Sequence, residues 1–168
     1  MHKPLKPQTA SKAMTRFGIG PTLATLSILY CLATFTATKH FAPLFNIRIL
    51  SANIRIAIGV ALILIGTVFF VVAVCATTRA YNAGKLCTKG IFGLCRHPVY
   101  SAWIVFLVPA MAVLADSLLG LTAPFVMYVL LKILIPKEDR YLEEKFGAEY
   151  TSYKRNVPEV LPIGWIKK

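Results

Sequence analysis

The chain has 168 residues, of which 57% are hydrophobic and only 15% are charged. An average soluble domain carries about 25% charged residues, so this composition excludes an ordinary soluble protein and indicates a single membrane domain. The formal net charge of +12 would also suit a nucleic-acid-binding protein, but the lysines and arginines lie between apolar runs. The positive-inside rule and attraction to anionic lipid explain that placement, so we expect a lipid bilayer and no nucleic acid as partner.

The four cysteines, Cys31, Cys75, Cys87 and Cys95, include no CxxC pair. A structural zinc site needs four close ligands, usually in pairs at short spacing, so we expect no metal. Cys31 and Cys75 lie in apolar runs and are expected to be small buried hydrophobic residues. The spacing of Cys87 and Cys95 supports neither a metal site nor a specific disulfide.

The hydropathy pattern predicts four membrane-spanning helices, because about 20 apolar residues cross the roughly 30 Å hydrocarbon core. A basic cytoplasmic tail, residues 1–17, precedes the first span. A retained span is favoured over a signal peptide for the first run, since the run is long and no clear cleavage site follows it. The predicted fold is therefore an all-α, polytopic membrane protein over residues 1–168. The spans are expected over residues 19–38, 56–78, 98–115 and 118–135.

The last two spans are separated only by Asp116 and Ser117, which predicts a tight antiparallel helical hairpin. Pro98 suits the first turn of a helix, where a missing N–H does no harm. Pro109 and Pro124 lie inside the expected spans and predict kinks. In the second span, glycine and alanine at 59, 61, 66, 73 and 76 would let neighbouring helices approach closely.

From Lys137 onward, apolar and aromatic residues recur at helical spacing among charged ones, which predicts an amphipathic interfacial helix with a bend at Gly147. Residues 137–168 are expected to form a cytoplasmic segment that lies on the membrane or against the spans, and the family resemblance given below implies that it covers a bound cofactor. Most lysines and arginines fall in the N-terminal tail, the 79–97 segment and this final segment, so all three are expected on the cytoplasmic side. The membrane would be the plasma membrane of a prokaryote or the endoplasmic reticulum of a eukaryote.

This topology places Arg96, His97, Tyr100, Glu138 and Asp139 on one face of the membrane. Cationic and neutral donors on one side and two carboxylates on the other suit a zwitterionic ligand, such as a free amino-acid group. The same residues could instead cap the hairpin and pair with each other as interfacial charges. The residues alone leave both interpretations open.

Two ordered motifs on either side of the hairpin carry a resemblance to a known family. The first is Gly90-Ile91-Phe92 followed by Arg96-His97-Pro98-Val99-Tyr100, and the second runs from Pro136-Lys137-Glu138-Asp139 through Phe146-Gly147-Ala148-Glu149-Tyr150 to Val157-Pro158 and Leu161-Pro162. Together they resemble the cofactor-binding signature of the isoprenylcysteine carboxyl methyltransferase and phospholipid methyltransferase superfamily. The resemblance covers roughly half of the chain.

The resemblance implies S-adenosylmethionine as cofactor, and it assigns binding roles by position. Lys85, Leu86 and Cys87 would approach the cofactor largely through backbone, and Phe92 would wall the adenosyl pocket. His97 and Tyr100 would contact the methionyl end or the ribose, Arg96 and Pro98 would belong to the same cofactor-binding motif, and Glu138 would take the ammonium group. Asp139 stands where the family commonly has a second Glu and keeps the charge.

The resemblance also implies methyl transfer to a lipophilic acceptor that enters sideways from the bilayer. Such a displacement needs positioning and desolvation more than covalent help, so no catalytic residue is assigned. Carboxyl O-methylation of an isoprenylcysteine-like acceptor is the first expectation, and N-methylation of a phospholipid amine is the second. The isoprenylcysteine branch has an Arg where this chain has Leu134, and relatives outside eukaryotes often have one where this chain has Glu159. A non-catalytic membrane scaffold that retains the fold is therefore a third alternative.

Overall fold

The structure is a computed structural model that describes residues 18–42, 44–47 and 49–162, and no strand occurs among these residues. The predicted all-α fold of a multi-pass membrane protein is confirmed. The basic tail predicted over 1–17 and the last residues of the predicted covering segment, 163–168, lie outside the described residues. In chain order the elements are α1 (Gly20–His40), α2 (Ala52–Asn82), η1 (Gly90–Gly93), α3 (Pro98–Ser101), η2 (Ala102–Leu107), α4 (Val108–Leu114), η3 (Gly120–Thr122), α5 (Ala123–Phe146) and α6 (Ala148–Asn156).

Among the described residues, three stretches of helix are long and apolar enough to cross a membrane: α1, α2 and the continuous stretch Gly120–Phe146. The fourth expected span appears as the shorter apolar stretch Pro98–Leu114, made of α3, η2 and α4. With 31 residues, α2 is roughly 46 Å long at 1.5 Å per residue, which exceeds the roughly 30 Å hydrocarbon core. Its last turns therefore extend past the core.

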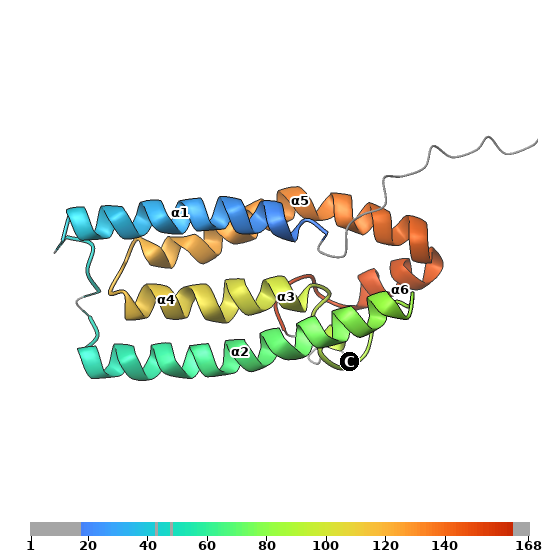
Figure 1. The fold of residues 1–168 in the computed structure, drawn as a ribbon, viewed down its shortest axis with the longest axis horizontal. Coiled ribbons are helices and arrows are strands. Elements are labelled where there is room, and N and C mark those ends of the chain that lie inside the picture. The colour runs from blue at the N-terminus through green and yellow to red at the C-terminus, as the bar shows by residue number, and fades with distance from the viewer. Residues whose placement is uncertain (1–17, 43, 48, 163–168) are drawn as a thin grey trace, which may run out of the picture.

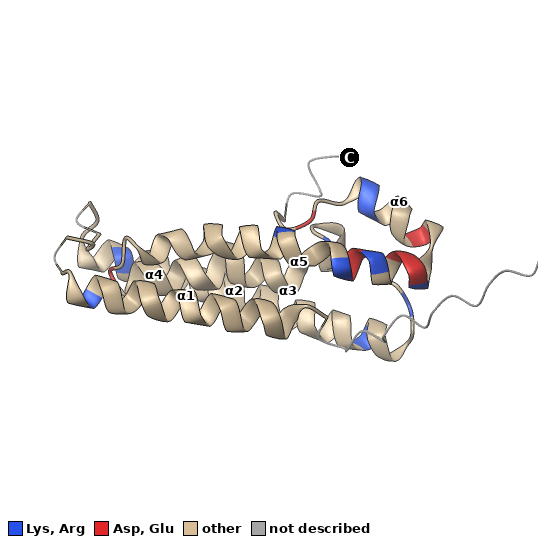
Figure 2. Ribbon diagram, turned by 90° about the horizontal axis from the view of Figure 1, so that it is seen from above, with Lys and Arg blue, Asp and Glu red and all other residues tan. Residues whose placement is uncertain are grey.

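The long helices lie side by side in one elongated bundle (Figure 1). α2 packs against η2 and α4, while α1 packs against α5 on the other side of the molecule. One end of the bundle carries residues 83–97 and 136–162, and we call it the site end. The opposite end, which we call the turn end, carries residues 41–51 and 115–119. Charged residues gather at the two ends, and most of them at the site end (Figure 2).

Two glycines of α2 allow its close approach to the Pro98–Leu114 stretch. A Cβ atom on Gly66 would lie 2.7 Å from the Cβ of Phe106, and one on Gly59 would lie 2.4 Å from the Cγ of Leu114. Both distances are far below van der Waals contact, so a larger residue at either position would have to displace its neighbour. At Gly66 the nearest atom is the Cβ of Phe106, which cannot move without the backbone of η2. In a membrane, where apolar contact with lipid is no worse than contact with protein, such close packing is what holds helices together.

Pro109 and Pro124 were expected inside membrane spans, but each lies in the first turn of a helix. The stretch before Pro109 is a π-helical segment, η2, and the N–H of Val108 donates to the carbonyl of Trp103, five residues back. The wider turn precedes Pro109, which lies in the first turn of α4. The kinks at Pro109 and Pro124 stay predictions. Pro124 lies in the first turn of α5, where its missing N–H interrupts no helical hydrogen bond.

The proline inside a helix is Pro136, and α5 continues through it as far as Phe146. The last span and the first part of the predicted interfacial helix are thus one continuous helix, which carries Glu138 and Asp139 beyond the apolar segment. The chain then bends at Gly147, whose φ of 55° is costly for residues with a Cβ. α6 turns back from there against the end of the bundle (Figure 1).

The turn end is tied together by Asp116. Its carboxylate accepts a hydrogen bond from the N–H of Ile47 at 2.9 Å and lies 3.4 Å from a guanidinium nitrogen of Arg55. The N–H of Leu118 donates to the carbonyl of Phe45 at 2.8 Å. The loop between α1 and α2 is therefore fixed on the hairpin turn.

Replacing Gly66 by leucine should destabilise the bundle, because the new side chain has to displace Phe106 and separate α2 from η2. Overpacking of this kind costs about 1–3 kcal/mol or more, which corresponds to a melting temperature lower by roughly 5 °C. Ala61→Leu is the matched control, since Ala61 is an exposed residue of the same helix. Thermal unfolding of the purified proteins in one detergent measures the difference. Equal melting temperatures for the two variants would contradict the packing described.

Candidate functional site

Arg96 and Asp139 form a buried ion pair at the site end. A guanidinium nitrogen of Arg96 lies 3.1 Å from Oδ1 of Asp139, and the two side chains are 9% and 8% exposed. The hydroxyl of Tyr150 donates to the same carboxylate oxygen, and Nζ of Lys154 lies 2.8 Å from the other one. The pair thus joins the loop before α3 to both α5 and α6. We call Arg96, Asp139, Tyr150 and Lys154 the ion cluster.

The environment of the ion cluster keeps its donors protonated. Burial raises the pKa of Tyr150 well above its usual range, and the hydrogen bond to Asp139 raises it further. The hydrogen bond to Asp139 likewise raises the pKa of Lys154. Tyr150 therefore remains a donor and Lys154 remains a cation across the physiological pH range.

Backbone hydrogen bonds fix the segment after α6 across this loop. The N–H of Arg96 donates to the carbonyl of Pro158 at 2.8 Å, and the N–H of His97 donates to the carbonyl of Glu159 at 3.0 Å. The carboxylate of Glu159 pairs with Lys132 of α5. The hydroxyl of Tyr153 donates to the carbonyl of Phe92 at 2.6 Å. As far as residue 162, the C-terminal segment covers the loop that carries Arg96 and His97.

Glu138 lies next to Asp139 in the sequence but faces different partners. One carboxylate oxygen of Glu138 accepts a hydrogen bond from the Tyr100 hydroxyl at 3.1 Å, and the other lies 3.7 Å from Nδ1 of His97. The rings of His97 and Tyr100 are stacked, with centroids 5.8 Å apart and planes 22° apart. Nε2 of His97 and Nε of Arg96 are buried without a hydrogen-bond partner among the described residues. Nε2 of His97 lies 3.8 Å from Oδ1 of Asp139, outside hydrogen-bonding distance, so both nitrogens keep hydrogen-bonding capacity for a water molecule or a ligand.

A cavity of about 150 Å³ gathers most of the predicted site residues. Seven of the ten predicted residues line it: Lys85, Leu86, Cys87, Phe92, Arg96, His97 and Glu138. Pro98 and Tyr100 line a neighbouring cavity of about 330 Å³. Asp139 lines neither cavity and lies behind Arg96 in the ion cluster. Asp139 therefore holds Arg96 in position and does not itself line either cavity.

The site also contains residues that the sequence analysis missed. Tyr81, Tyr141 and Phe146 line the smaller cavity, and their rings lie within 6 Å of Nζ of Lys145. The spacing of Glu138, Tyr141 and Lys145 on one face of a helix was a usable signal for part of this wall. Tyr81 comes from the end of α2, and no local pattern indicates its contact with α5.

Three cavities follow one another from the site end into the bundle. The 150 Å³ and 330 Å³ cavities share the lining residues Gly18, Thr77, Phe92, Arg96, His97 and Glu138. The 330 Å³ cavity in turn shares Gly20, Ala24, Val99 and Tyr100 with an apolar groove of about 510 Å³ between α1 and the α3–α4 stretch. Ligand pockets usually enclose about 300–1,000 Å³, so the series is large enough for two ligands.

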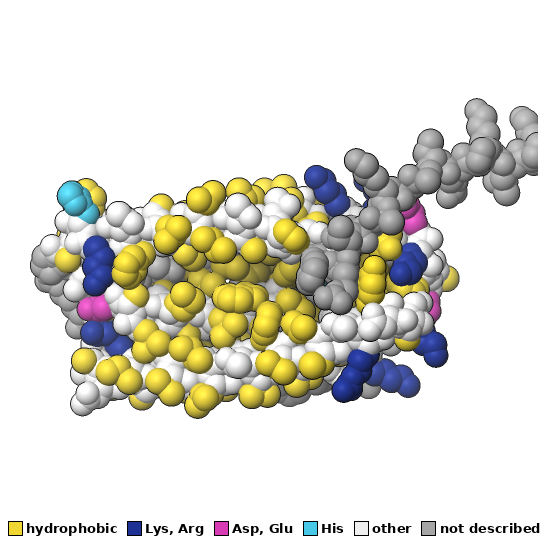
Figure 3. Space-filling model, in the orientation of Figure 1, with side chains coloured by type: hydrophobic (Ala, Val, Ile, Leu, Met, Phe, Trp, Pro, Cys, Tyr) yellow, Lys and Arg dark blue, Asp and Glu magenta, His cyan; other side chains and the backbone are white. Residues whose placement is uncertain are grey.

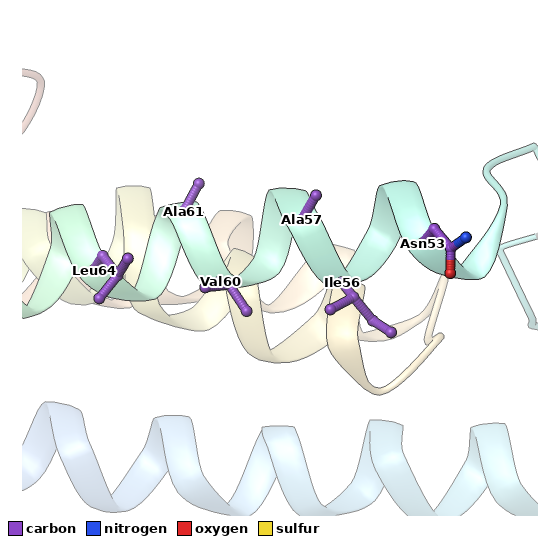
Figure 4. Close-up of a pocket in the computed structure, with 6 residues that line it drawn as sticks. All are labelled: Asn53, Ile56, Ala57, Val60, Ala61 and Leu64. Atoms are coloured by element: carbon purple, nitrogen blue, oxygen red, sulfur yellow. The ribbon is translucent and has the colours of Figure 1, made fainter.

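One further depression lies apart from this series. It runs along α2 and is lined by six residues of that helix, Asn53, Ile56, Ala57, Val60, Ala61 and Leu64 (Figure 4). It contains no ionisable side chain. Among the described residues, no group of three or more His, Cys, Asp or Glu side chains is placed to hold a metal ion.

Comparison with known proteins gives the chain a family. A family model described as "Protein of unknown function (DUF1295)" matches residues 18–157. A probable protein-S-isoprenylcysteine O-methyltransferase of Oryza sativa subsp. indica is 29% identical over 63% of the chain and 60% of its own length. Protein-S-isoprenylcysteine O-methyltransferase B of Arabidopsis thaliana is 25% identical over 62% of the chain and 58% of its length.

A shorter match involves the Mus musculus protein-S-isoprenylcysteine O-methyltransferase, 30% identical over 46% of the chain and 28% of its own length. The chain thus spans less than two thirds of the length of these relatives. No solved structure matches the chain. The chain belongs to the DUF1295 family, and its relatives confirm the resemblance to the isoprenylcysteine carboxyl methyltransferase superfamily.

Proposed function

We propose that the protein is an S-adenosylmethionine-dependent methyltransferase of a lipophilic acceptor, with its active site at the cytoplasmic face of the membrane. The observation that carries the proposal is the continuous series of cavities at the site end. A polar and aromatic cavity with lysine, arginine and glutamate side chains adjoins an apolar groove through shared lining residues. A water-soluble cofactor and a membrane-soluble acceptor need such an arrangement to meet.

The residues of the smaller cavity fit the cofactor chemically. Glu138 has free acceptor capacity for an ammonium group. The unpaired Nε–H of Arg96 can donate to a polar atom, and Nε2 of His97 can donate or accept. Lys85 supplies a cation, and Phe92 with Tyr81 supplies aromatic surface for a base. When bound, S-adenosylmethionine supplies a methyl group on a positively charged sulfonium sulfur.

Within this proposal the protein contributes position and a dry environment. Tyr100 orients the Glu138 carboxylate through its hydrogen bond, and the ion cluster holds the loop of Arg96 and His97 in place. The segment up to residue 162 covers the loop and limits the access of water. Rate enhancement in such a site comes from orientation and from electrostatics in a water-poor pocket.

The relatives favour a carboxyl group as the acceptor, since they are named as isoprenylcysteine O-methyltransferases. One structural observation favours the alternative, N-methylation of a phospholipid amine. Leu134, at the position of the family arginine, packs against the apolar core, and the nearby cation Lys132 pairs with Glu159. Neither residue is available to hold an acceptor carboxylate. The third alternative, a non-catalytic scaffold, would bind no cofactor.

Substitutions of the neighbouring residues Glu138 and Asp139 should affect different properties, cofactor binding and thermal stability respectively. Glu138→Gln should weaken S-adenosylmethionine binding about tenfold or more, because a hydrogen bond to a charged group contributes about 1.5–3 kcal/mol. Its melting temperature should stay close to that of the parent. Asp139→Asn should lower the melting temperature by roughly 10 °C, because breaking a buried ion pair costs about 3–5 kcal/mol. Calorimetry and thermal unfolding of the detergent-purified proteins measure both effects, and a parent protein that binds no cofactor would refute the proposed enzyme.

Alkylation of cysteine should report on the cavity directly. Cys87 lines the smaller cavity, whereas Cys95 is fully buried and burial raises the pKa of its thiol to about 11. N-ethylmaleimide should therefore modify Cys87 well before Cys95, and S-adenosylmethionine should slow the modification of Cys87. Cys75, which is exposed on α2, is the internal control whose rate the cofactor should leave unchanged. Mass spectrometry of the peptides gives each rate, and an unprotected Cys87 would place the cofactor elsewhere.

The methylated product should identify the acceptor group. Membranes that contain the protein are incubated with methyl-labelled S-adenosylmethionine, and Glu138→Gln serves as the matched control. Label released by mild base as a methyl ester is expected for a carboxyl acceptor. Label that stays with a phospholipid headgroup would show amine methylation instead.

A further inference from the structure

Lys145 is a cation that lines the 150 Å³ cavity without an acidic partner among the described residues. Its Nζ lies 5.2 Å from the ring centroid of Phe146, 5.8 Å from that of Tyr81 and 5.9 Å from that of Tyr141. The three rings line the same cavity, and we call them the aromatic box. They come from the end of α2 and the last turns of α5, so the box fixes the Lys145 ammonium group where these two helices meet.

The aromatic box holds this ammonium group in place but does not satisfy it. The faces of aromatic rings attract a cation without neutralising its charge. They are also weak hydrogen-bond acceptors, so the three N–H donors of the ammonium group stay available. No carboxylate of a described residue lies within 4.0 Å of Nζ. A cation with a fixed position and free donors beside a cavity is suited to bind an anion.

The other cations of the cavity are less suited to that task. Arg96 is buried and already paired with Asp139. Lys85 lies in the loop after α2, where no ring or carboxylate of a described residue holds its side chain. On the face shown in Figure 3, Lys and Arg side chains lie at the two ends of the molecule with hydrophobic side chains between them. An anion that enters from water therefore meets its cations at an end of the bundle.

We propose that Lys145 binds the carboxylate of the cofactor's amino-acid group while Glu138 binds its ammonium group. The inference rests on the proposed function, because it takes S-adenosylmethionine as the ligand. It adds a cofactor-binding residue that the family resemblance does not assign. It also adds a selectivity, a preference for methyl donors that carry a carboxylate.

The spacing of Glu138 and Lys145 on α5 fits an amino-acid group. Seven residues turn a helix by about 700°, so the two side chains leave α5 on the same face, roughly 10 Å apart along its axis. The nitrogen and the farther carboxylate oxygen of one amino-acid group lie about 3.5 Å apart. A hydrogen bond of about 2.8 Å at each end brings the total to about 9 Å. One amino-acid group therefore spans the distance between the two side chains.

The charges of the two connected cavities favour the same orientation. Glu138 lines both the 150 Å³ and the 330 Å³ cavity, whereas Lys145 and the aromatic box line only the first of these two. A carboxylate turned toward the 330 Å³ cavity would lie near Glu138, and the cation there, Arg96, is already paired. A carboxylate at Lys145 avoids this repulsion and leaves the 330 Å³ cavity to the acceptor.

Decarboxylated S-adenosylmethionine tests this role, because it lacks the carboxylate and keeps the ammonium and sulfonium groups. Calorimetry of the detergent-purified protein gives the dissociation constant of each ligand. The parent should bind S-adenosylmethionine about five- to tenfold more tightly, since only this ligand forms the hydrogen bond between two charged groups. Lys145→Met should remove the preference by weakening S-adenosylmethionine binding alone. Lys145→Arg keeps the charge and should retain most of the preference.

Lys137→Met is the matched control, since Lys137 is exposed on the same helix and lines neither cavity. It should leave the ratio of the two dissociation constants unchanged. An equal loss of affinity for both ligands in Lys145→Met would show that the side chain only shapes the cavity, which overturns the proposal. Loss of the preference in Lys85→Met, with Lys145→Met unchanged, would place the carboxylate on the loop and overturn it as well.

A second measurement needs no variant. S-adenosylmethionine should slow the acetylation of Lys145 by acetic anhydride, the decarboxylated ligand should not, and Lys137 should react at one rate throughout. Mass spectrometry of the peptides gives these rates, and equal protection by both ligands would overturn the proposal even where the Lys145 variants fail to fold. A parent protein that binds neither ligand refutes the proposed enzyme, whereas one that binds both equally leaves the enzyme intact and refutes the role of Lys145.

Discussion

The site end depends on one interaction, the buried ion pair between Arg96 and Asp139. Taking two charges out of water is costly, and the attraction between them offsets this cost only when further hydrogen bonds satisfy their remaining atoms. Here Tyr150 and Lys154 satisfy the carboxylate, and Glu159 lies 4.0 Å from the guanidinium group. The charges and polar atoms of the pair are therefore fully satisfied only when α5, α6 and the segment after α6 are all in place. The same condition makes the cavity a product of the whole C-terminal half of the chain.

The ion pair also explains why two adjacent carboxylates have separate tasks. Successive side chains on a helix point about 100° apart, so Glu138 and Asp139 share only the His97 ring, Glu138 near its Nδ1 at 3.7 Å and Asp139 near its Nε2 at 3.8 Å, and otherwise have different partners. Asp139 faces Arg96 and α6, whereas Glu138 faces Tyr100 and His97. Because Asp139 neutralises Arg96, the charge of Glu138 is not offset by that guanidinium group, which agrees with the ammonium-binding role proposed for Glu138. Glu138 and Asp139 look like one acidic pair in the sequence, but in the structure Asp139 stabilises the loop of Arg96 and Glu138 lines the cavity.

The sequence predicted the helices, and which of their ends lie together, better than it predicted how the helices pack. Hydropathy located the helices, and the hairpin through Asp116 correctly returned Glu138 to the side of His97. The π-helical turn before Pro109, the place of Pro124 and the passage of α5 through Pro136 depend on how neighbouring helices satisfy or exclude backbone groups, which no local pattern records. The aromatic wall around Lys145 was only partly visible, because Tyr81 reaches it from a helix that ends 60 residues earlier in the chain. The place of Asp139 behind the cavity followed only from its partners in α6.

The candidate site lies at the boundary between two environments, water and the hydrocarbon core of the membrane. Charged residues cannot lie deep in the hydrocarbon core without partners, and a hydrocarbon chain gains nothing from leaving it. The boundary between these environments lies at Tyr100, whose ring lines the apolar groove while its hydroxyl contacts Glu138. On the polar side Arg96 is buried only because its charge is paired, and on the apolar side the groove carries no charged side chain. The proposed reaction between a charged cofactor and a lipophilic acceptor requires such a boundary to be held fixed, and the α3 turn with the ion cluster behind it fixes this one.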